Sequence, residues 1–147
     1  MNLKNFRLFV VIAFFTQCSA CFAQIKNNAE EAFRVATETQ KPVLLIFAGS
    51  DWCAPCIRFE KQVLSQARFL EYAKSHLVIL KADFPQRKKL SPEEEKQNDS
   101  LAEQFNPKGE FPKLVLLRED KSVVSTLTYS NQSSDEFISQ IKDSLLR

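Results

Sequence analysis

The chain has 147 residues, of which 26% are charged and 44% are hydrophobic, and its formal net charge is +2. These values suit one globular domain with its own core, and the two glycines argue against a collagenous, solenoid or glycine-loop nucleotide-binding protein. Residues 1–23 contain two of the 20 Lys and Arg residues but none of the 18 acidic ones, so the remaining chain is formally neutral. That balance predicts no nucleic-acid partner.

The first residues predict export. Lys4 and Arg7 precede an uncharged apolar run at residues 8–15, and small residues follow up to Ala23. A basic start, a short apolar centre and a small-residue cleavage site are the three parts of a secretory signal peptide. A membrane anchor or a buried N-terminal helix is less favoured, because the apolar run is shorter than the roughly 20 residues that span a bilayer. We therefore predict a signal peptide at residues 1–23.

Cleavage at that point leaves a mature domain at residues 24–147, for which we predict a periplasmic location. Cys18 and Cys21 fall in the segment that is removed, and a lipid anchor through Cys21 or Cys18 is an alternative. The remaining cysteines, Cys53 and Cys56, lie three positions apart and form no wider disulfide framework. In an exported protein such a pair is either a redox centre or half of a metal site.

The hydrophobic pattern predicts four helices and four strands. Apolar residues at helical spacing indicate amphipathic helices, and continuous apolar runs indicate buried strands. The third helix begins at Ser91 and Pro92, which suit the N-cap and the first helical position. The predicted helices are 28–40, a helix from the cysteine motif to about residue 73 that is continuous or kinked, 91–105 and 134–146, and the predicted strands are 43–48, 76–82, 113–117 and 122–128.

The order of these elements is α-β-α-β-α-β-β-α. The first two strands are joined by a helix and therefore run parallel, whereas the last two form an antiparallel hairpin around a turn at residues 118–121. The sequence thus predicts an α/β fold with a mixed central sheet flanked by helices.

The motif Trp52-Cys53-Ala54-Pro55-Cys56 carries the predicted chemistry. Two thiols three positions apart at the start of a helix lie on one face and can close a small disulfide. Cys53 lies at the helix N-terminus, where free N–H groups and the helix dipole stabilise a thiolate. We therefore predict that Cys53 attacks a substrate disulfide and that the more shielded Cys56 then displaces the product. The redox-active disulfide itself is the only redox group that this chemistry needs.

A metal site and a structural disulfide are the alternatives for this pair. Zinc requires four ligands, but after removal of residues 1–23 no other cysteine remains and the only histidine is His76, which suits a surface or edge position. Copper(I) carriage is poorly supported because Met1 is the only methionine. A permanent structural disulfide here would close a very small loop and stabilise little. We predict no metal and no other cofactor.

A second motif, Phe111-Pro112, directly precedes the third predicted strand. Proline is tolerated at a strand entrance for ordinary reasons. It equally suits a cis proline beside the disulfide, which leaves the backbone of Phe111 free to pair with an extended substrate. The residue pattern does not distinguish the two isomers. Together the two motifs give the predicted substrate-binding residues, which are Trp52, Ala54, Pro55 and Phe111.

From about Ala29 to Leu146 the chain resembles the thioredoxin superfamily. The features that match are the apolar strand before the cysteine motif, the Phe111-Pro112 pair, the hairpin and the last helix. The stretch 47–61 is similar to secreted thioredoxin-like proteins of bacteria and to the C-terminal thioredoxin-like domain of the membrane disulfide reductase. The resemblance implies a thioredoxin-like fold, with Cys53 as nucleophile, Cys56 as resolving thiol and Pro112 as a cis proline.

Two features depart from the thioredoxin pattern. Thioredoxins carry a buried Asp six residues before the first cysteine, and this chain has Phe47 there. Glu60, four residues after Cys56 on the same helical face, is the predicted replacement, with a solvated Glu paired to a nearby Lys or Arg as the alternative. Lys81 matches the lysine that often accompanies the missing acid. The segment 85–98 is longer than in a minimal thioredoxin, and it either shapes partner choice or is a solvated helix start.

The predicted function is a disulfide reductase or isomerase acting on disulfide-containing exported proteins. Export, the lone cysteine pair and Pro55, which resembles the dipeptides of reducing members, favour this direction. An exported reductant must be recharged, so we predict a membrane electron donor as a partner, and a monomer. The alternatives are an oxidase that introduces disulfides and a non-enzymatic thioredoxin-fold module that docks partners at the Phe111-Pro112 groove.

Overall fold

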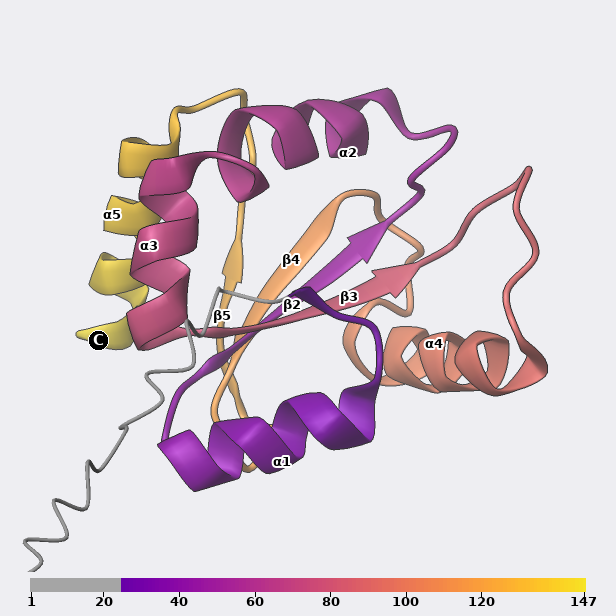
Figure 1. The fold of residues 1–147 in the computed structure, drawn as a ribbon, viewed down its shortest axis with the longest axis horizontal. Helices are drawn as coiled ribbons and strands as arrows, with labels where there is room; N and C mark the ends of the chain where they lie inside the picture. Colours follow the sequence, from indigo (N-terminus) through magenta and orange to yellow (C-terminus); the bar gives the residue numbers. More distant parts are fainter. Residues whose placement is uncertain (1–24) are drawn as a thin grey trace, which may run out of the picture.

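The computed structural model describes residues 25–147, which form a central β-sheet covered by helices on both faces (Figure 1). The predicted signal peptide and its cysteines lie outside the described residues. Among the described helices, none has the length and apolar character that crossing a membrane requires.

The sheet has five strands in the order β1-β3-β2-β4-β5. β2 runs parallel to β3 and antiparallel to β4, and β4 forms the predicted hairpin with β5. The mixed sheet predicted from the sequence is therefore confirmed. The strands are β1 (Ile25–Lys26), β2 (Val43–Ala48), β3 (Val78–Asp83), β4 (Lys113–Leu117) and β5 (Val123–Leu127).

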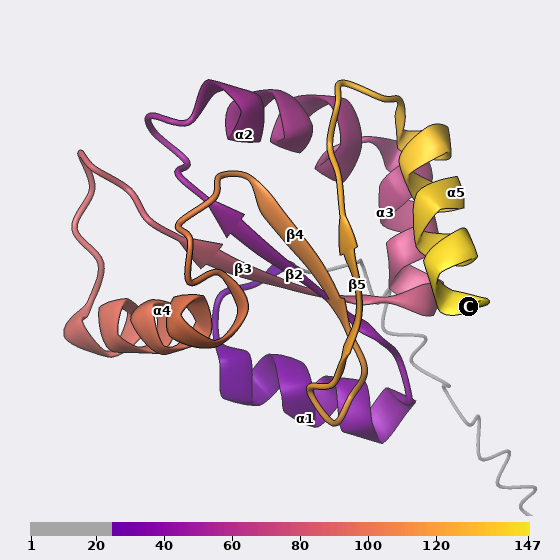
Figure 2. The ribbon, with the colours of Figure 1, turned by 180° about the vertical axis from the view of Figure 1, so that it is seen from behind.

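Two helices cover one face of the sheet and three cover the other. Helices α1 and α4 lie below the sheet in Figure 1, and α2, α3 and α5 lie on the opposite side, as the view from behind in Figure 2 also shows. The helices are α1 (Ala29–Thr39), α2 (Ala54–Phe59), α3 (Ala67–His76), α4 (Pro92–Phe105) and α5 (Ser134–Leu145).

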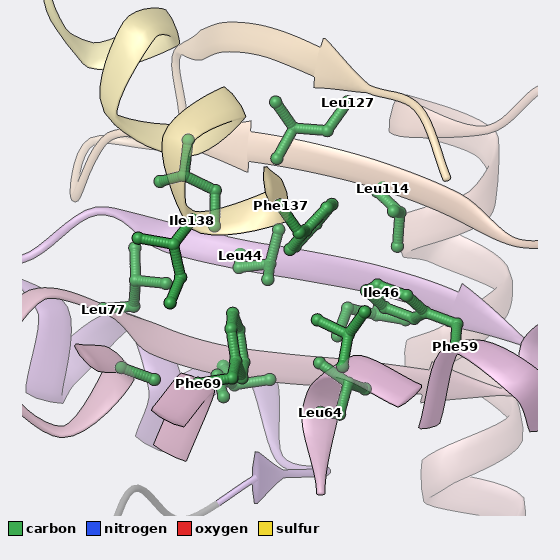
Figure 3. Close-up of a cluster of buried hydrophobic side chains, with 14 of the residues drawn as sticks. Leu44, Ile46, Phe59, Leu64, Phe69, Leu77, Leu114, Leu127, Phe137 and Ile138 are labelled. Carbon is green, nitrogen blue, oxygen red and sulfur yellow. The ribbon is translucent and has the colours of Figure 1, made fainter. Parts of the chain in front are cut away.

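The continuous apolar run of β2 is fully buried because the strand is central and has helices on both faces. Successive side chains of a strand point to opposite faces. Leu44 and Ile46 accordingly join the core under α2, α3 and α5, while Leu45 and Phe47 join the core under α1 and α4. Figure 3 shows part of the first core, which also contains both cysteines of the motif.

The predicted long helix after the cysteine motif is divided, so the kinked alternative is the correct one. α2 passes directly into a π-helical turn, Glu60–Leu64, in which the Ser65 N–H donates to the Glu60 carbonyl at 2.9 Å. Gln66 is extended and precedes α3. A π-turn adds one residue to the helical repeat and commonly lies at functional sites. Here it begins four residues after Cys56.

Candidate active site

The cysteine motif lies where β2 ends and α2 begins. A tight turn follows Ala48, and the Cys53 N–H donates to the Gly49 carbonyl at 2.9 Å. Cys53 is the N-cap of α2, and its sulfur is joined to that of Cys56, with 5.2 Å between the two Cα atoms. The two residues are only 4% and 5% exposed. The predicted pair is thus a disulfide at the start of a helix.

The Cys53 sulfur also takes the place of a capping oxygen. The Cys56 N–H donates to it at 3.3 Å, which satisfies one of the four N–H groups that a helix start leaves free. Pro55 lies in the first turn and has no N–H to satisfy. Ala54 and Pro55 are exposed beside the buried disulfide. The same N–H is therefore in place to stabilise a thiolate at Cys53 when the disulfide is reduced.

An aromatic wall lies next to the disulfide. The Trp52 ring meets the Phe111 ring edge to face at 5.3 Å between centroids, and Phe111 meets Phe84 at 5.6 Å. Phe111 also packs against the core that contains both cysteines. The Phe111–Pro112 peptide bond is cis, the isomer that the resemblance implied. The structure thus brings together the two predicted motifs, which are far apart in the sequence.

The position of the Trp52 ring is determined by two neighbours. Its indole N–H donates to the Phe84 carbonyl at 2.7 Å. Gly49 lies under the ring, where an added Cβ would come within 2.3 Å of the indole. Trp52 is nevertheless 39% exposed. It therefore presents a fixed apolar surface to solvent next to the cysteines, together with Ile57, which is 48% exposed.

A pocket of about 310 Å³ opens beside Cys56. Its lining includes Cys56, Glu60 and Lys81, with Ala48 as the wall that β2 provides. The Lys81 ammonium bonds to the Glu60 carboxylate at 3.1 Å. Glu60 therefore lies at the same pocket as Cys56, as a replacement for the missing acid would. It is also paired with a lysine, as the alternative of a solvated Glu in an ion pair proposed. Its role in catalysis stays a prediction.

Phe47 faces away from this pocket. The side chain is fully buried in the core under α1 and α4 and stacks on Phe84. The position six residues before the first cysteine thus lies on the opposite face of β2 from Cys56. The carboxylate that shares a pocket with Cys56 comes from the helix, at Glu60, where the π-turn begins.

Two aspartates that the sequence analysis missed hold the edge of the site. Both Asp51 oxygens accept backbone N–H groups from the segment after β3, at 2.9 Å from Gln86, 2.7 Å from Arg87 and 3.3 Å from Lys88. These bonds, led by that from Gln86, lower the pKa of the Asp51 carboxyl below its usual value. Asp83 accepts the N–H and the hydroxyl of Ser50 at 2.9 and 2.6 Å.

A signal for these contacts was present in the sequence. Asp83 ends the strand that runs parallel to β2, so the segments that follow β2 and β3 leave the sheet at the same edge. Asp and Asn side chains in such turns commonly accept backbone N–H groups. Phe84, the third aromatic ring of the wall, follows directly after Asp83. Asp83 and Phe84 were therefore predictable as neighbours of the motif once the two strands were taken as parallel, whereas the backbone partners of Asp51 were not.

Within residues 25–147, no three or more His, Cys, Asp or Glu side chains form a group that could hold a metal ion. His76 ends α3, where its ring stacks on Tyr72 at 4.5 Å between centroids. It belongs to the surface of the α3 and α5 layer, as a surface or edge residue would.

A thioredoxin-like sheet with a Cys-x-x-Cys disulfide at the start of the helix after its central strand defines the class of thiol–disulfide oxidoreductases. Residues 24–118 match the model of the family described as Thioredoxin-like. The chain belongs to this family and has the activity class of a thiol–disulfide oxidoreductase.

Three curated relatives are similar to this chain. The disulfide bond reductase DsbH of Chlamydia pneumoniae is 30% identical over 115 residues, which cover 78% of this chain and 69% of the relative. The thioredoxin-related protein DsbJ of the same organism is 27% identical over 124 residues, or 80% of this chain but 35% of the relative. The thiol:disulfide interchange protein DsbD of Ralstonia nicotianae is 39% identical over 64 residues, or 42% of this chain and 10% of the relative.

Solved structures agree with this assignment. A structure described as DsbH oxidoreductase aligns with a TM-score of 0.79 and 27% identity, covering 99% of this chain and 95% of the other. The oxidised C-terminal domain of DsbD from Neisseria meningitidis aligns with a TM-score of 0.54 and 19% identity, over 78% and 90% of the two chains, which supports the shared fold.

Proposed function

We propose that this protein is an exported disulfide reductase that reduces disulfides in other exported proteins. The observation that carries the proposal is the Cys53 sulfur, which caps α2 and lies beside an exposed aromatic wall. Similarity to a protein described as a disulfide bond reductase supports the direction of transfer. The shorter match to a thiol:disulfide interchange protein supports a redox partnership with a membrane electron donor.

The reaction proceeds by two exchanges. The Cys53 thiolate attacks one sulfur of the substrate disulfide, forms a mixed disulfide and releases the other substrate sulfur as a thiolate. Cys56 then attacks the Cys53 sulfur, restores the Cys53–Cys56 disulfide and releases the second substrate thiol. Two electrons pass to the substrate in each cycle. The electron donor returns them by reducing the Cys53–Cys56 disulfide, and no metal or other cofactor takes part.

Substrate binds across the exposed surface around the disulfide. Trp52 and Phe111 offer an apolar wall, and the exposed Ala54 and Pro55 leave the approach to Cys53 free of large side chains. The backbone of Phe111, before the cis Pro112, pairs with an extended segment of the substrate. This arrangement accepts many sequences, since it relies on backbone and apolar contacts rather than on a charged pocket.

Glu60 takes the proton that Cys56 loses when it attacks the mixed disulfide. Both residues line the same pocket, and the Glu60 carboxylate is bonded to the Lys81 ammonium at 3.1 Å. Glu60 stands in for the buried acid of thioredoxins, from the helix instead of from the strand.

The site of action is outside the cytoplasm. Residues 1–23 have the composition of a signal peptide, and the mature domain begins at residue 24 and works in the periplasm as a monomer. A lipid anchor through Cys21 or Cys18 is the alternative mode of localisation.

The reduction potential of the Cys53–Cys56 disulfide tests the proposal. The purified protein is equilibrated with graded glutathione or dithiothreitol buffers and its free thiols are counted. A potential of about −270 mV, as for thioredoxin, is the expected result, whereas about −120 mV would identify an oxidase. The Cys53→Ser variant is the control, because it stops either enzyme but leaves a non-enzymatic binding module intact. A pair that never cycles would leave the binding module as the better description.

A further inference from the structure

The loop between β3 and α4, residues 84–91, is fastened to the turn that carries the redox motif. Its backbone N–H groups at residues 86–88 donate to Asp51, and the Trp52 indole donates to the Phe84 carbonyl. The β3–α4 loop and the turn between β2 and α2 project from the same side of the molecule in both views (Figures 1 and 2). The loop is therefore a fixed neighbour of the disulfide.

The β3–α4 loop carries a cluster of cations, Arg87, Lys88 and Lys89, which we call the basic cluster. All three side chains are exposed, and none belongs to an ion pair within residues 25–147. The charge of Arg87 helps to lower the pKa of Asp51, but the two residues form no ion pair, and the oxygens of Asp51 already accept the N–H groups of the loop. The basic cluster thus offers three charges whose donors are free to bind another molecule.

We propose that the basic cluster docks an acidic segment that flanks the disulfide of a protein substrate, an inference that rests on the proposed reductase function. Fixed surface charges raise the rate of encounter with oppositely charged partners and set their orientation. Because Asp51 and Trp52 hold the loop in place, an acidic segment bound there brings the neighbouring disulfide to Cys53. The backbone and apolar contacts of the site accept many sequences, so the basic cluster supplies the selectivity.

Acidic residues on α4 limit the direction of approach. Glu95 and Asp99 share a surface hollow of about 500 Å³ with Lys88 and Lys89. These carboxylates repel an acidic segment and therefore disfavour approach over α4. On the other side, the oxygens of Asp51 are already engaged by the backbone N–H groups of the loop, which leaves that side, next to the redox motif, for the segment.

Binding is measured first, without any redox step. The probe is a fluorescent peptide that lacks cysteine and carries three Glu residues, and a matched peptide with three Gln residues is its control. Anisotropy is recorded with the wild-type protein and with the Arg87→Gln, Lys88→Gln, Lys89→Gln triple variant. The matched control variant is Lys74→Gln, Arg118→Gln, Arg147→Gln, which removes three exposed cations from α3, from the far end of β4 and from the C-terminus.

Reduction is measured next, on disulfide peptides with the same Glu or Gln flanks and on the small neutral bis(2-hydroxyethyl) disulfide. We expect the wild-type protein to bind and reduce the Glu peptide about tenfold better than the Gln peptide at low salt. We expect the wild-type protein to lose that preference at about 0.5 M salt. At low salt the triple variant should lack the preference, and the control variant should keep it. The rate with the neutral disulfide should be the same in all three proteins.

The two proposals fail in different ways. Equal binding of the Glu and Gln peptides by the wild-type protein, or a Glu preference that survives in the triple variant, would overturn the docking proposal. An equal loss in the control variant would overturn it as well, since net charge alone would then explain the effect. Failure to reduce the neutral disulfide would instead count against the reductase function, and the anisotropy would still decide whether the basic cluster binds acidic segments.

Discussion

Asp51 joins the redox motif to a segment 35 residues away in the sequence. The carboxylate accepts three consecutive backbone N–H groups, which would otherwise be satisfied only by water. These bonds favour the charged form, so the pKa of Asp51 is lower in the folded protein than in the unfolded chain. The contribution of Asp51 to loop order is therefore present above the ordinary Asp pKa and is lost as the pH falls through the lower folded value.

The direction of this pKa shift predicts how the β3–α4 loop responds to pH. At pH values well below about 4, protonation of Asp51 should release the loop, and the amides of residues 86–88 should exchange faster relative to their intrinsic rates. Asp51→Asn should show the fast exchange already at neutral pH, because the neutral amide offers one acceptor oxygen instead of two. Hydrogen exchange followed by NMR measures both effects. The control is Asp143→Asn on α5, and equal protection in both variants would contradict the anchoring role of Asp51.

Glu60 permits a second test at the residue scale. Glu60→Gln keeps the size of the side chain but removes the proton acceptor from the Cys56 pocket. We expect the resolution of the mixed disulfide to slow by about tenfold to a hundredfold near neutral pH and its pH profile to shift upward, because solvent must then take the proton. The first attack by Cys53 should keep its rate.

Rapid quenching with an alkylating agent separates these two steps, because it traps the mixed disulfide before Cys56 resolves it. The matched control is Glu71→Gln, an exposed acid on α3. If Glu60→Gln and Glu71→Gln resolve the mixed disulfide at the same rate at every pH, Glu60 is a surface partner of Lys81 and nothing more.

The element boundaries follow local chemistry where the chain supplies a cap. α4 begins as predicted, with Ser91 as N-cap, Pro92 in the first turn and a capping box in which Ser91 and Glu94 satisfy each other's backbone N–H groups. α5 begins in the same way with Ser133 and Glu136. Such starts are visible in a sequence because every partner lies within four residues.

A cap of this kind has a measurable effect on stability. Ser91→Ala removes the side-chain oxygen that accepts the Glu94 N–H, and we expect the free energy of unfolding to fall by about 1 kcal/mol. Urea unfolding followed by circular dichroism measures the change. Ser100→Ala, at an exposed position inside α4, is the matched control, and it should change stability by less than about 0.5 kcal/mol in either direction. A similar loss in both variants would assign the effect to the helix interior instead of the cap.

Elements that depend on distant partners were not predictable in the same way. β1 contains only Ile25 and Lys26, too short for a periodic pattern, and it exists because β3 offers a parallel edge. The π-turn after α2 adds one residue to a helix whose apolar pattern reads equally well as continuous or kinked. The contacts of Asp51 join separate loops. The cysteine pair was predictable because its chemistry is contained in five consecutive residues, whereas the pocket around Glu60 required the fold.

At the scale of the whole molecule, the sheet separates a core that contains the redox site from one that does not. Both cysteines belong to the core under α2, α3 and α5, in which Phe137 meets Phe59 and Phe69 at 5.1 and 6.0 Å between ring centroids (Figure 3). The core under α1 and α4 contains Phe33 and Phe47 but no cysteine. Both cores contain side chains of β2, but only the core under α2, α3 and α5 packs against the helix whose N-cap is Cys53.

This division predicts different consequences for two equivalent substitutions. Phe137→Ala and Phe33→Ala each remove a buried ring, and each should lower the free energy of unfolding by about 3–5 kcal/mol in urea titrations. Phe137→Ala should in addition speed the reduction of the Cys53–Cys56 disulfide by dithiothreitol in the folded state, because Phe59 on α2 loses its neighbour and the buried sulfurs become more accessible. Phe33→Ala should leave that rate unchanged, since Phe33 belongs to the core that contains neither cysteine.

The comparison is informative because both variants lose similar stability. If the faster reduction came only from global unfolding, it would appear in both variants and would scale with the free energy of unfolding. A rate that rises only in Phe137→Ala assigns the protection of the disulfide to the packing of its own layer. A rate that rises equally in both variants would be explained by global unfolding, and would contradict a separate protective role for the core that contains the cysteines.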